Sequence, residues 1–236
     1  MSDLCEDLKE QLYRLSDPEY RVFQSALLPT VPLNRVIGVR VPALRRLARQ
    51  MTRAGQTMPY LSGAVLPHST YDEDNLHAFL IEGIDDYGSC MAELQRFLPY
   101  IDNWATCDLM APPVLGTQPE HLYKTVKVWL ESAHEFTVRY GLVTLMRHFL
   151  DERYSRDVLY LVSAVTHEGY YVKMAAAWLM AEALAGHWED AYPFLASEAL
   201  PVWTRKKAVQ KALESRKLTP EQKSVLRILR EEMKSE

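Results

Sequence analysis

The sequence predicts an all-α protein, built as a solenoid of stacked antiparallel helical pairs. About thirteen helical segments, most of them amphipathic, follow one another with short links at Pro, Gly, Asp-Pro and Thr-Pro. No segment shows the alternation of apolar and polar residues, bounded by turns, that is typical of a β-strand. In the second half, helix starts recur near residues 102, 135, 169 and 202. These steps of about 33 to 34 residues are typical of helical-pair repeats.

The first three helices are predicted from their caps and their apolar spacing. Residues 2–15 begin with a serine cap and place leucines at positions 4, 8, 12 and 15, on one helical face. In residues 17–28, Asp17 is a candidate N-cap and Pro18 occupies the first helical position. The third segment, residues 41–51, contains a proline near its start and has apolar residues at helical spacing.

The remaining helices are predicted in the same way. Residues 71–84 begin with acidic side chains, which stabilise a helix N-terminus, and His77 in this segment is interpreted as a helix-packing or surface residue. A longer helix followed by a shorter one is expected in each step of the second half. Because the repeats are degenerate in sequence, an irregular all-α bundle stays open at this point. The later helical segments span residues 88–101, 103–115, 119–132, 135–150, 155–167, 170–186, 189–197, 204–215 and 219–233.

The composition is that of an ordinary soluble globular protein, with 48% hydrophobic and 25% charged residues. We expect a single repeat domain over residues 1–236. The three cysteines, Cys5, Cys90 and Cys107, are scattered and predict neither a disulfide framework nor a zinc site, which fits a reduced cytoplasmic setting. No run approaches the roughly 18 apolar residues that span a bilayer, and the charged, amphipathic N-terminus is unlike a signal peptide. We therefore expect a cytoplasmic protein with no membrane contact.

The charge distribution is more informative than the net charge of −4. Residues 35–53 carry six arginines and no acid, whereas residues 66–103 carry eight acids and one arginine. Residues 203–236 carry ten Lys or Arg side chains against five acids. Such segregation can build a basic face on an acidic protein. The alternative is a set of solvated helix faces that differ in sign and have no partner.

Four side chains recur at the repeat spacing on successive long helices: Trp104 with Asp108, then Arg139, then Trp178. If equivalent helices line one face, these side chains converge on a cleft. Indole walls suit a base or a sugar, a guanidinium suits a phosphate, and a carboxylate suits a cation or a water molecule. Taken singly, each has a structural alternative: a core position for Trp178, a pair with Glu135 for Arg139, and a contact with a helix N-terminus for Asp108.

Other chemistry is not supported by the sequence. Among the histidines, His134, His148 and His167 lack metal-ligand spacing, so no metal is expected. Cys107 has no paired histidine, and the nine glycines form no phosphate-binding loop, so no nucleotide cofactor is expected either.

Four stretches together resemble the bacterial DNA alkylation repair family, the AlkD-like HEAT-repeat DNA glycosylases. They are "IGVRVPALRRLA", "IDNWATCDLMAP", "TVRYGLVTLMRHFLDE" and "YYVKMAAAWLMAEALA". Each motif is loose, and their order and spacing over about residues 17 to 230 make the resemblance specific. It implies a right-handed solenoid of HEAT-like helical pairs with a concave DNA-binding face.

The resemblance also implies an activity. Trp104 and Asp108 match the family's Trp-x-x-x-Asp pair, Arg139 matches the arginine of the next repeat, and Trp178 matches the second tryptophan. The implied enzyme is a monofunctional alkylpurine DNA glycosylase that needs no cofactor and acts as a monomer on double-stranded DNA. It removes cationic alkylated purines, such as 3-methyladenine and 7-methylguanine, without flipping the base out of the duplex.

The residue types suit this chemistry. Asp108 would stabilise the cationic sugar and position water, while Trp104 and Trp178 would cradle the sugar and phosphate. The acidic segment 66–103 is expected to face away from DNA. Two alternatives are a non-catalytic HEAT-repeat protein that binds distorted or branched DNA, and a protein-interaction scaffold. The side chains expected to contact the DNA backbone are Arg139, Arg40, Arg45, Arg46, Arg49, Lys173, Arg205, Lys206 and Lys207.

Overall fold

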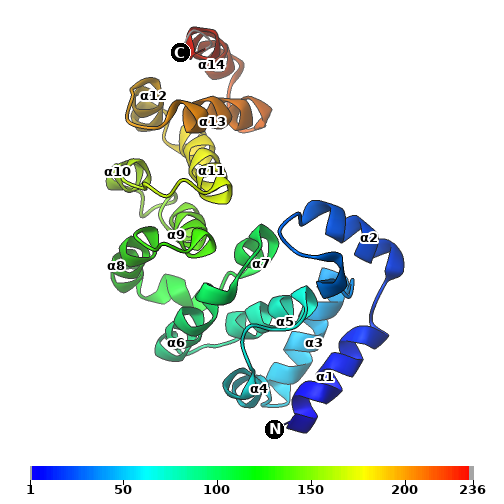
Figure 1. Ribbon diagram of the computed structural model, residues 1–236. Helices are drawn as coiled ribbons and strands as arrows, with labels where there is room; N and C mark the ends of the chain where they lie inside the picture. Colours follow the sequence, from blue (N-terminus) through cyan, green and yellow to red (C-terminus); the bar gives the residue numbers. More distant parts are fainter. Residues whose placement is uncertain (1, 234–236) are drawn as a thin grey trace. The chain divides into compact units, whose positions relative to one another are not determined.

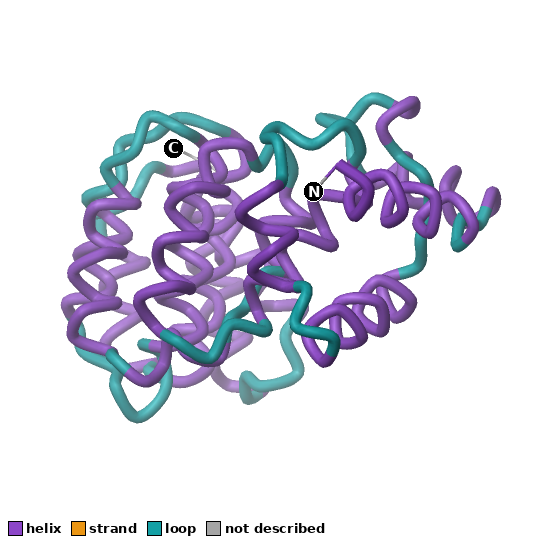
Figure 2. The backbone as a smooth tube through the Cα atoms, turned by 90° about the horizontal axis from the view of Figure 1, so that it is seen from below, coloured by secondary structure: helices purple, strands orange, loops and turns teal. Residues whose placement is uncertain are grey.

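The computed structural model describes residues 2–233, and over these residues the fold is all-α (Figures 1 and 2). The predicted fold class is therefore confirmed: the described residues contain no strand, and their one isolated β-bridge joins Ser16 and Val39. The α-helices are α1 (Ser2–Arg14), α2 (Pro18–Leu27), α3 (Val41–Arg53), α4 (Thr57–Gly63), α5 (Tyr71–Glu82), α6 (Tyr87–Phe97), α7 (Trp104–Leu109), α8 (Pro119–Leu130), α9 (Glu135–His148), α10 (Asp157–Ser163), α11 (Tyr170–Gly186), α12 (Trp188–Ala196), α13 (Val202–Glu214) and α14 (Pro220–Glu232). Short 3-10 helices are η1 (Leu33–Arg35), η2 (Leu98–Tyr100) and η3 (Pro113–Thr117).

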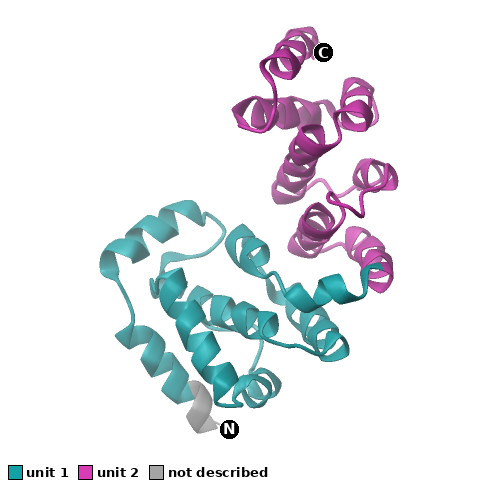
Figure 3. Ribbon diagram, turned by 180° about the vertical axis from the view of Figure 1, so that it is seen from behind, with its two compact units in different colours: residues 1–119 teal, residues 120–236 magenta. Residues whose placement is uncertain are grey.

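The helices form two compact units, residues 1–119 and residues 120–236 (Figure 3). In the first unit, α5 packs against α3 and α7, and α1, α4 and α6 also contact it. Almost every side chain of α5 is buried, so this helix is the centre of the unit. The expectation of one domain over residues 1–236 stays a prediction beside this division.

The second unit is a stack of helical pairs. α11 packs between α9 and α13, and α12 and α14 pack against α11 and α13 respectively. Figure 1 shows α8, α10 and α12 together on one side of the α9–α11–α13 row. The starts of α9, α11 and α13 at residues 135, 170 and 202 agree with the predicted repeat positions. The stacked helical pairs predicted from the repeat spacing are therefore present in this unit.

Local sequence signals explain several of the helix starts. The Asp17 side chain accepts a hydrogen bond from the backbone N–H of Tyr20 at 2.9 Å, as its position before Pro18 predicts. At α14, Thr219 and Gln222 form a reciprocal capping box ahead of the helix. One helix was not predicted: α4 is only seven residues long and contains a proline, so it shows too few turns for a helical period.

The acidic start of α5 is buried rather than solvated. The Asp72 carboxylate accepts hydrogen bonds from the backbone N–H groups of Ile37 and Val39, both at 2.7 Å, and from Gly38 at 3.3 Å. Burial raises the pKa of Asp72, and these bonds oppose the shift. Asp72 is therefore not a solvated surface charge, and that alternative is wrong for this residue. Its carboxylate holds the loop before α3 against α5.

Gly38 in that loop has a φ of 92°, which disfavours other residues. A Cβ atom there would lie 2.6 Å from Cβ of Arg21, so the close approach also requires glycine. The neighbouring Arg35 pairs with the buried Asp74 at 3.0 Å and with Asp102, just ahead of α7. Burial raises the pKa of Asp74 well above its usual range, and the arginine counteracts this shift. These contacts fix the segment that leads into α7.

A buried histidine pair joins the loop before α5 to the middle of that helix. Nε2 of His68 and Nδ1 of His77 are 2.8 Å apart, and the His77 ring stacks on Phe97 with ring centroids 4.1 Å apart. Burial lowers the pKa of His68 to about 4 and that of His77 to about 2. Both rings are therefore neutral in the folded protein near pH 7. Of the two interpretations of His77, the packing one is confirmed and the surface one is wrong, since its side chain is fully buried.

Candidate functional site

The short helix α7 carries Trp104 and Asp108 on one face, because four residues make about one helical turn. Asn103 caps the helix by accepting a hydrogen bond from the Thr106 N–H at 2.8 Å. The Thr106 hydroxyl donates to Oδ1 of Asn75 on α5 at 2.9 Å. These two bonds fix the position and the rotation of α7. The face opposite Trp104 and Asp108 is buried and includes Thr106.

The expectation that Trp104 and Asp108 lie on a long helix is wrong. α7 has six residues, whereas α8, the next α-helix along the chain, has twelve. Two consecutive prolines follow shortly after α7, and the residue before a proline avoids the helical conformation. A six-residue helix has few internal hydrogen bonds, so its position depends on contacts with α5 and α2.

Trp104 is both a packing residue and a partly exposed one. Its indole N–H donates to the backbone carbonyl of Leu27, at the end of α2, at 3.0 Å. One side of the ring packs against a buried cluster. Trp104 and Asp108 are each half-buried, so part of each side chain stays open to solvent. The cluster behind the indole consists of Leu28, Val31, Val36, Tyr71 and Ala105.

Glu82, at the end of α5, ties the chain after α7 to α3. Its Oε1 accepts a hydrogen bond from the backbone N–H of Ala111 at 2.9 Å. Its Oε2 accepts one from Nη1 of Arg45 at 2.5 Å. The segment that follows Asp108 is thus joined through a single carboxylate to the arginine-rich helix of the same unit.

In the second unit, Arg139 on α9 is buried, with 6% of its surface exposed. Its Nη1 donates to the backbone carbonyl of Tyr171 at 2.8 Å. Glu135, one turn earlier on α9, accepts a hydrogen bond from the Tyr171 N–H at 2.7 Å. Both side chains therefore hold the first turn of α11. The guanidinium of Arg139 is fixed in position by this contact.

Trp178 on α11 is half-buried and lines a pocket of about 400 Å³ within the second unit. A wholly buried core position, the structural alternative for this residue, is therefore excluded. The start of α9 is bonded to Tyr171 at the start of α11, and the end of α9 lines the same pocket as Trp178, so the two helices run in the same direction. Seven residues separate Tyr171 from Trp178, which is about 10 Å along a helix. The pocket is lined by Trp178 with Met146, Arg147, Leu150, Asp151, Glu182, Ala185, Gly186 and Lys217.

The predicted basic residues of α3 and its N-terminus are mostly accessible. Arg40 is exposed and pairs with Asp17 at 2.8 Å. Arg46 and Arg49 are exposed on α3, and Arg45 is half-buried against Glu82. Their expected contact with DNA stays a prediction, and all four lie in the first unit.

The basic residues near α13 differ from one another. Arg205 is 4% exposed and donates from Nε to the Leu195 carbonyl at 3.0 Å, which caps the end of α12. Lys206 and Lys207 are half-buried, and Nζ of Lys207 donates to the Gln210 side chain at 2.8 Å. Arg205 thus has a structural contact, and a DNA contact by these three residues stays a prediction.

Sequence reasoning missed an aromatic side chain among the basic ones. Nζ of Lys173 lies 5.6 Å from the ring centre of Trp203, and Nζ of Lys207 lies 6.0 Å from it. The exposed Tyr170 meets the same ring edge-on, with ring centroids 5.9 Å apart. The sequence feature that could have indicated it is the position of Trp203, two residues before the basic run Arg205 to Lys207. The two predicted lysines Lys173 and Lys207 are therefore brought together around one indole.

A family model described as DNA alkylation repair enzyme matches residues 8–212. The chain belongs to this family. The matched span contains every residue of the candidate site and runs from α1 to within α13. Membership of this family indicates that the protein functions in DNA repair and that its substrate is DNA. It also confirms the resemblance to the DNA alkylation repair family that the four sequence stretches predict. The comparison with curated proteins gave no match. Within the described residues, no helix is long and apolar enough to cross a membrane.

Proposed function

We propose that this DNA alkylation repair enzyme is a monofunctional glycosylase. It hydrolyses the N-glycosidic bond of cationic alkylated purines, such as 3-methyladenine and 7-methylguanine, in duplex DNA. The observation that supports this most is the anchoring of α7, which holds Trp104 and Asp108 half-exposed on one face. The Asn103 cap, the Asn75 contact and the Leu27 contact hold these side chains before substrate arrives. Such preorganisation is the main requirement for electrostatic catalysis.

In the proposed reaction, the bond between C1′ of the deoxyribose and the purine nitrogen breaks, and its electron pair goes to the purine. The purine then leaves as a neutral base, because it carried the positive charge beforehand. The sugar becomes cationic, and the Asp108 carboxylate stabilises that charge. Water adds to C1′ and gives its proton to the carboxylate or to solvent, which leaves an abasic site.

The other residues bind and orient the DNA. Trp104 and Trp178 would pack against the sugar and backbone of the lesion and stabilise the cation through their ring faces. Arg139 would contact a backbone phosphate, and its bond to Tyr171 would keep the guanidinium in place. The lesion would stay in the duplex, with no flipped base. The flanking duplex would be held, without reading of sequence, by Arg40, Arg46, Arg49, Lys173, Lys206 and Lys207. Arg45 and the buried Arg205 would support them from behind, through their contacts with Glu82 and with the Leu195 carbonyl.

The proposed activity is tested by incubating the protein with duplex DNA that contains 7-methylguanine and measuring free base by chromatography. We expect base release well above spontaneous depurination, an abasic site in the product, and no strand cleavage by the protein. DNA binding without release would support the non-catalytic alternative instead. Absence of both binding and release would favour the scaffold alternative.

A further inference from the structure

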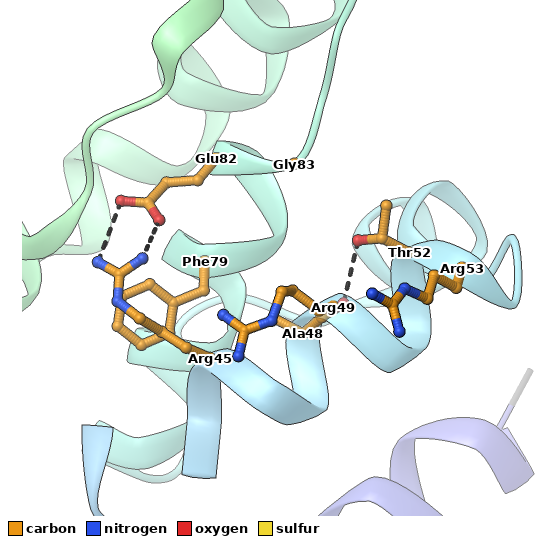
Figure 4. Close-up of a pocket in the computed structure, with 8 residues that line it drawn as sticks. All are labelled: Arg45, Ala48, Arg49, Thr52, Arg53, Phe79, Glu82 and Gly83. Atoms are coloured by element: carbon orange, nitrogen blue, oxygen red, sulfur yellow. Dashed lines mark hydrogen bonds and ion pairs between the residues drawn. The ribbon is translucent and has the colours of Figure 1, made fainter. Parts of the chain in front are cut away.

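The face of α3 that meets α5 forms an arginine pocket in the first unit, with a volume of about 330 Å³ (Figure 4). Three guanidinium groups and one carboxylate line it, so the pocket has a surplus of positive charge. Its lining consists of Arg45, Arg49 and Arg53 with Glu82, and of Ala48, Thr52, Phe79 and Gly83.

The three arginines of the arginine pocket form a row along α3. Positions 45, 49 and 53 are four residues apart, so they share one face and follow one another at about 6 Å. Figure 4 shows their guanidinium groups spread along the helix rather than gathered at one point. A row of this kind suits an extended polyanion better than a single small anion.

The arginines of the row differ in how they are held. Nη1 and Nη2 of Arg45 lie 2.5 and 3.5 Å from the two carboxylate oxygens of Glu82. The Arg45 guanidinium carbon lies 4.1 Å from the ring centre of Phe79. Arg45 is therefore fixed and its charge largely balanced. Arg49 and Arg53 are exposed, and neither has a hydrogen bond or an ion pair within the described residues.

We propose that the arginine pocket binds neighbouring phosphates of one DNA strand, with Arg49 and Arg53 as the direct contacts. Arg53 is not among the residues that the sequence predicts to contact DNA. Arg45, held by Glu82, forms the fixed wall of the pocket beside Arg49 and Arg53. Glu82 also accepts the hydrogen bond of Ala111, so the wall is connected to the chain that leaves the Asp108 helix. Phosphates held here would set the register of the strand relative to Asp108. That DNA is the occupant rests on the proposed function.

The test is the salt dependence of binding to an undamaged duplex, measured by fluorescence anisotropy. For Arg49→Gln with Arg53→Gln, we expect the slope of log affinity against log salt to fall by about two in magnitude, because two phosphate contacts are lost. The matched control is Arg227→Gln with Arg230→Gln, which removes two exposed arginines from α14. A slope that stays at the wild-type value, or falls equally in the control, would overturn the proposal.

Two further measurements identify the occupant. Arg49→Lys with Arg53→Lys keeps both charges and should keep most of the slope, which separates loss of charge from misfolding. Inorganic phosphate is added to the wild-type protein in a thermal shift assay. Stabilisation by phosphate that disappears in the glutamine variant, with no change in the DNA slope, would mean a small-anion site and refute the proposal.

The outcomes also separate this inference from the glycosylase proposal. A reduced slope in a protein that releases no base would support the arginine pocket and refute the glycosylase. Base release with an unchanged slope would refute the arginine pocket alone.

Discussion

Replacement of Asp108 by asparagine is expected to slow the release of 7-methylguanine by about 100- to 1000-fold. Asparagine keeps the size and shape of the side chain but removes the negative charge that faces the developing sugar cation. DNA affinity should change little, because the carboxylate makes no favourable contact with phosphate. The measurement is single-turnover base release, beside DNA binding by anisotropy.

The control for this substitution is Asp7→Asn, which removes an exposed carboxylate from α1, outside the matched span. It should release base at the wild-type rate. Release by the Asp108→Asn protein at the wild-type rate would remove Asp108 from the mechanism, even if the protein is a glycosylase.

Acid is expected to destabilise the fold through the buried pair of His68 and His77. In the unfolded chain both histidines titrate near pH 6.5, whereas burial lowers their pKa values to about 4 and about 2 in the fold. Well above pH 6.5 both rings are neutral in either state. As the pH falls below 6.5, the unfolded chain binds protons that the folded chain does not, so stability is lost. At pH 5 the loss is about 2 kcal/mol for each histidine.

The histidine contribution is isolated by comparing the wild type with His68→Leu and His77→Phe combined, by urea unfolding at pH 7 and pH 5. The raised pKa values of Asp72 and Asp74 act with the opposite sign, but both proteins share them. We expect the stability of the wild type relative to the variant to fall by about 3 to 4 kcal/mol between the two pH values. His121→Gln changes an exposed position and keeps the buried pair, so it should lose stability between pH 7 and pH 5 as the wild type does. An equal pH dependence in all three proteins would contradict the account.

The helices were largely predictable because their signals are local. Asp17 with Pro18, and the repeat starts that became α9, α11 and α13, depend on neighbours within one turn or on repeat spacing. The short length of α7 was missed, although the two prolines that follow it are visible in the sequence. α4 was missed because seven residues are too few to show a period.

The environment of each site residue was less predictable, because it depends on tertiary partners. Nothing near Arg139 or Arg205 in the sequence indicates that backbone carbonyls of Tyr171 and Leu195 accept their hydrogen bonds. Trp178 lies in an apolar helix, where a core position is the default, yet it lines a pocket. The burial of Asp72 likewise depends on a loop more than thirty residues earlier in the chain.

The central claim is that Asp108 and Trp104, one turn apart on α7, serve one reaction. A double-mutant cycle tests it directly: single-turnover release of 7-methylguanine is measured for the wild type, Asp108→Asn, Trp104→Phe and the combined variant, since phenylalanine keeps an aromatic ring on the buried cluster. Groups that act on one transition state are not additive, so we expect the combined loss to be at least tenfold smaller than the product of the two single losses. Losses that multiply independently would contradict a shared site.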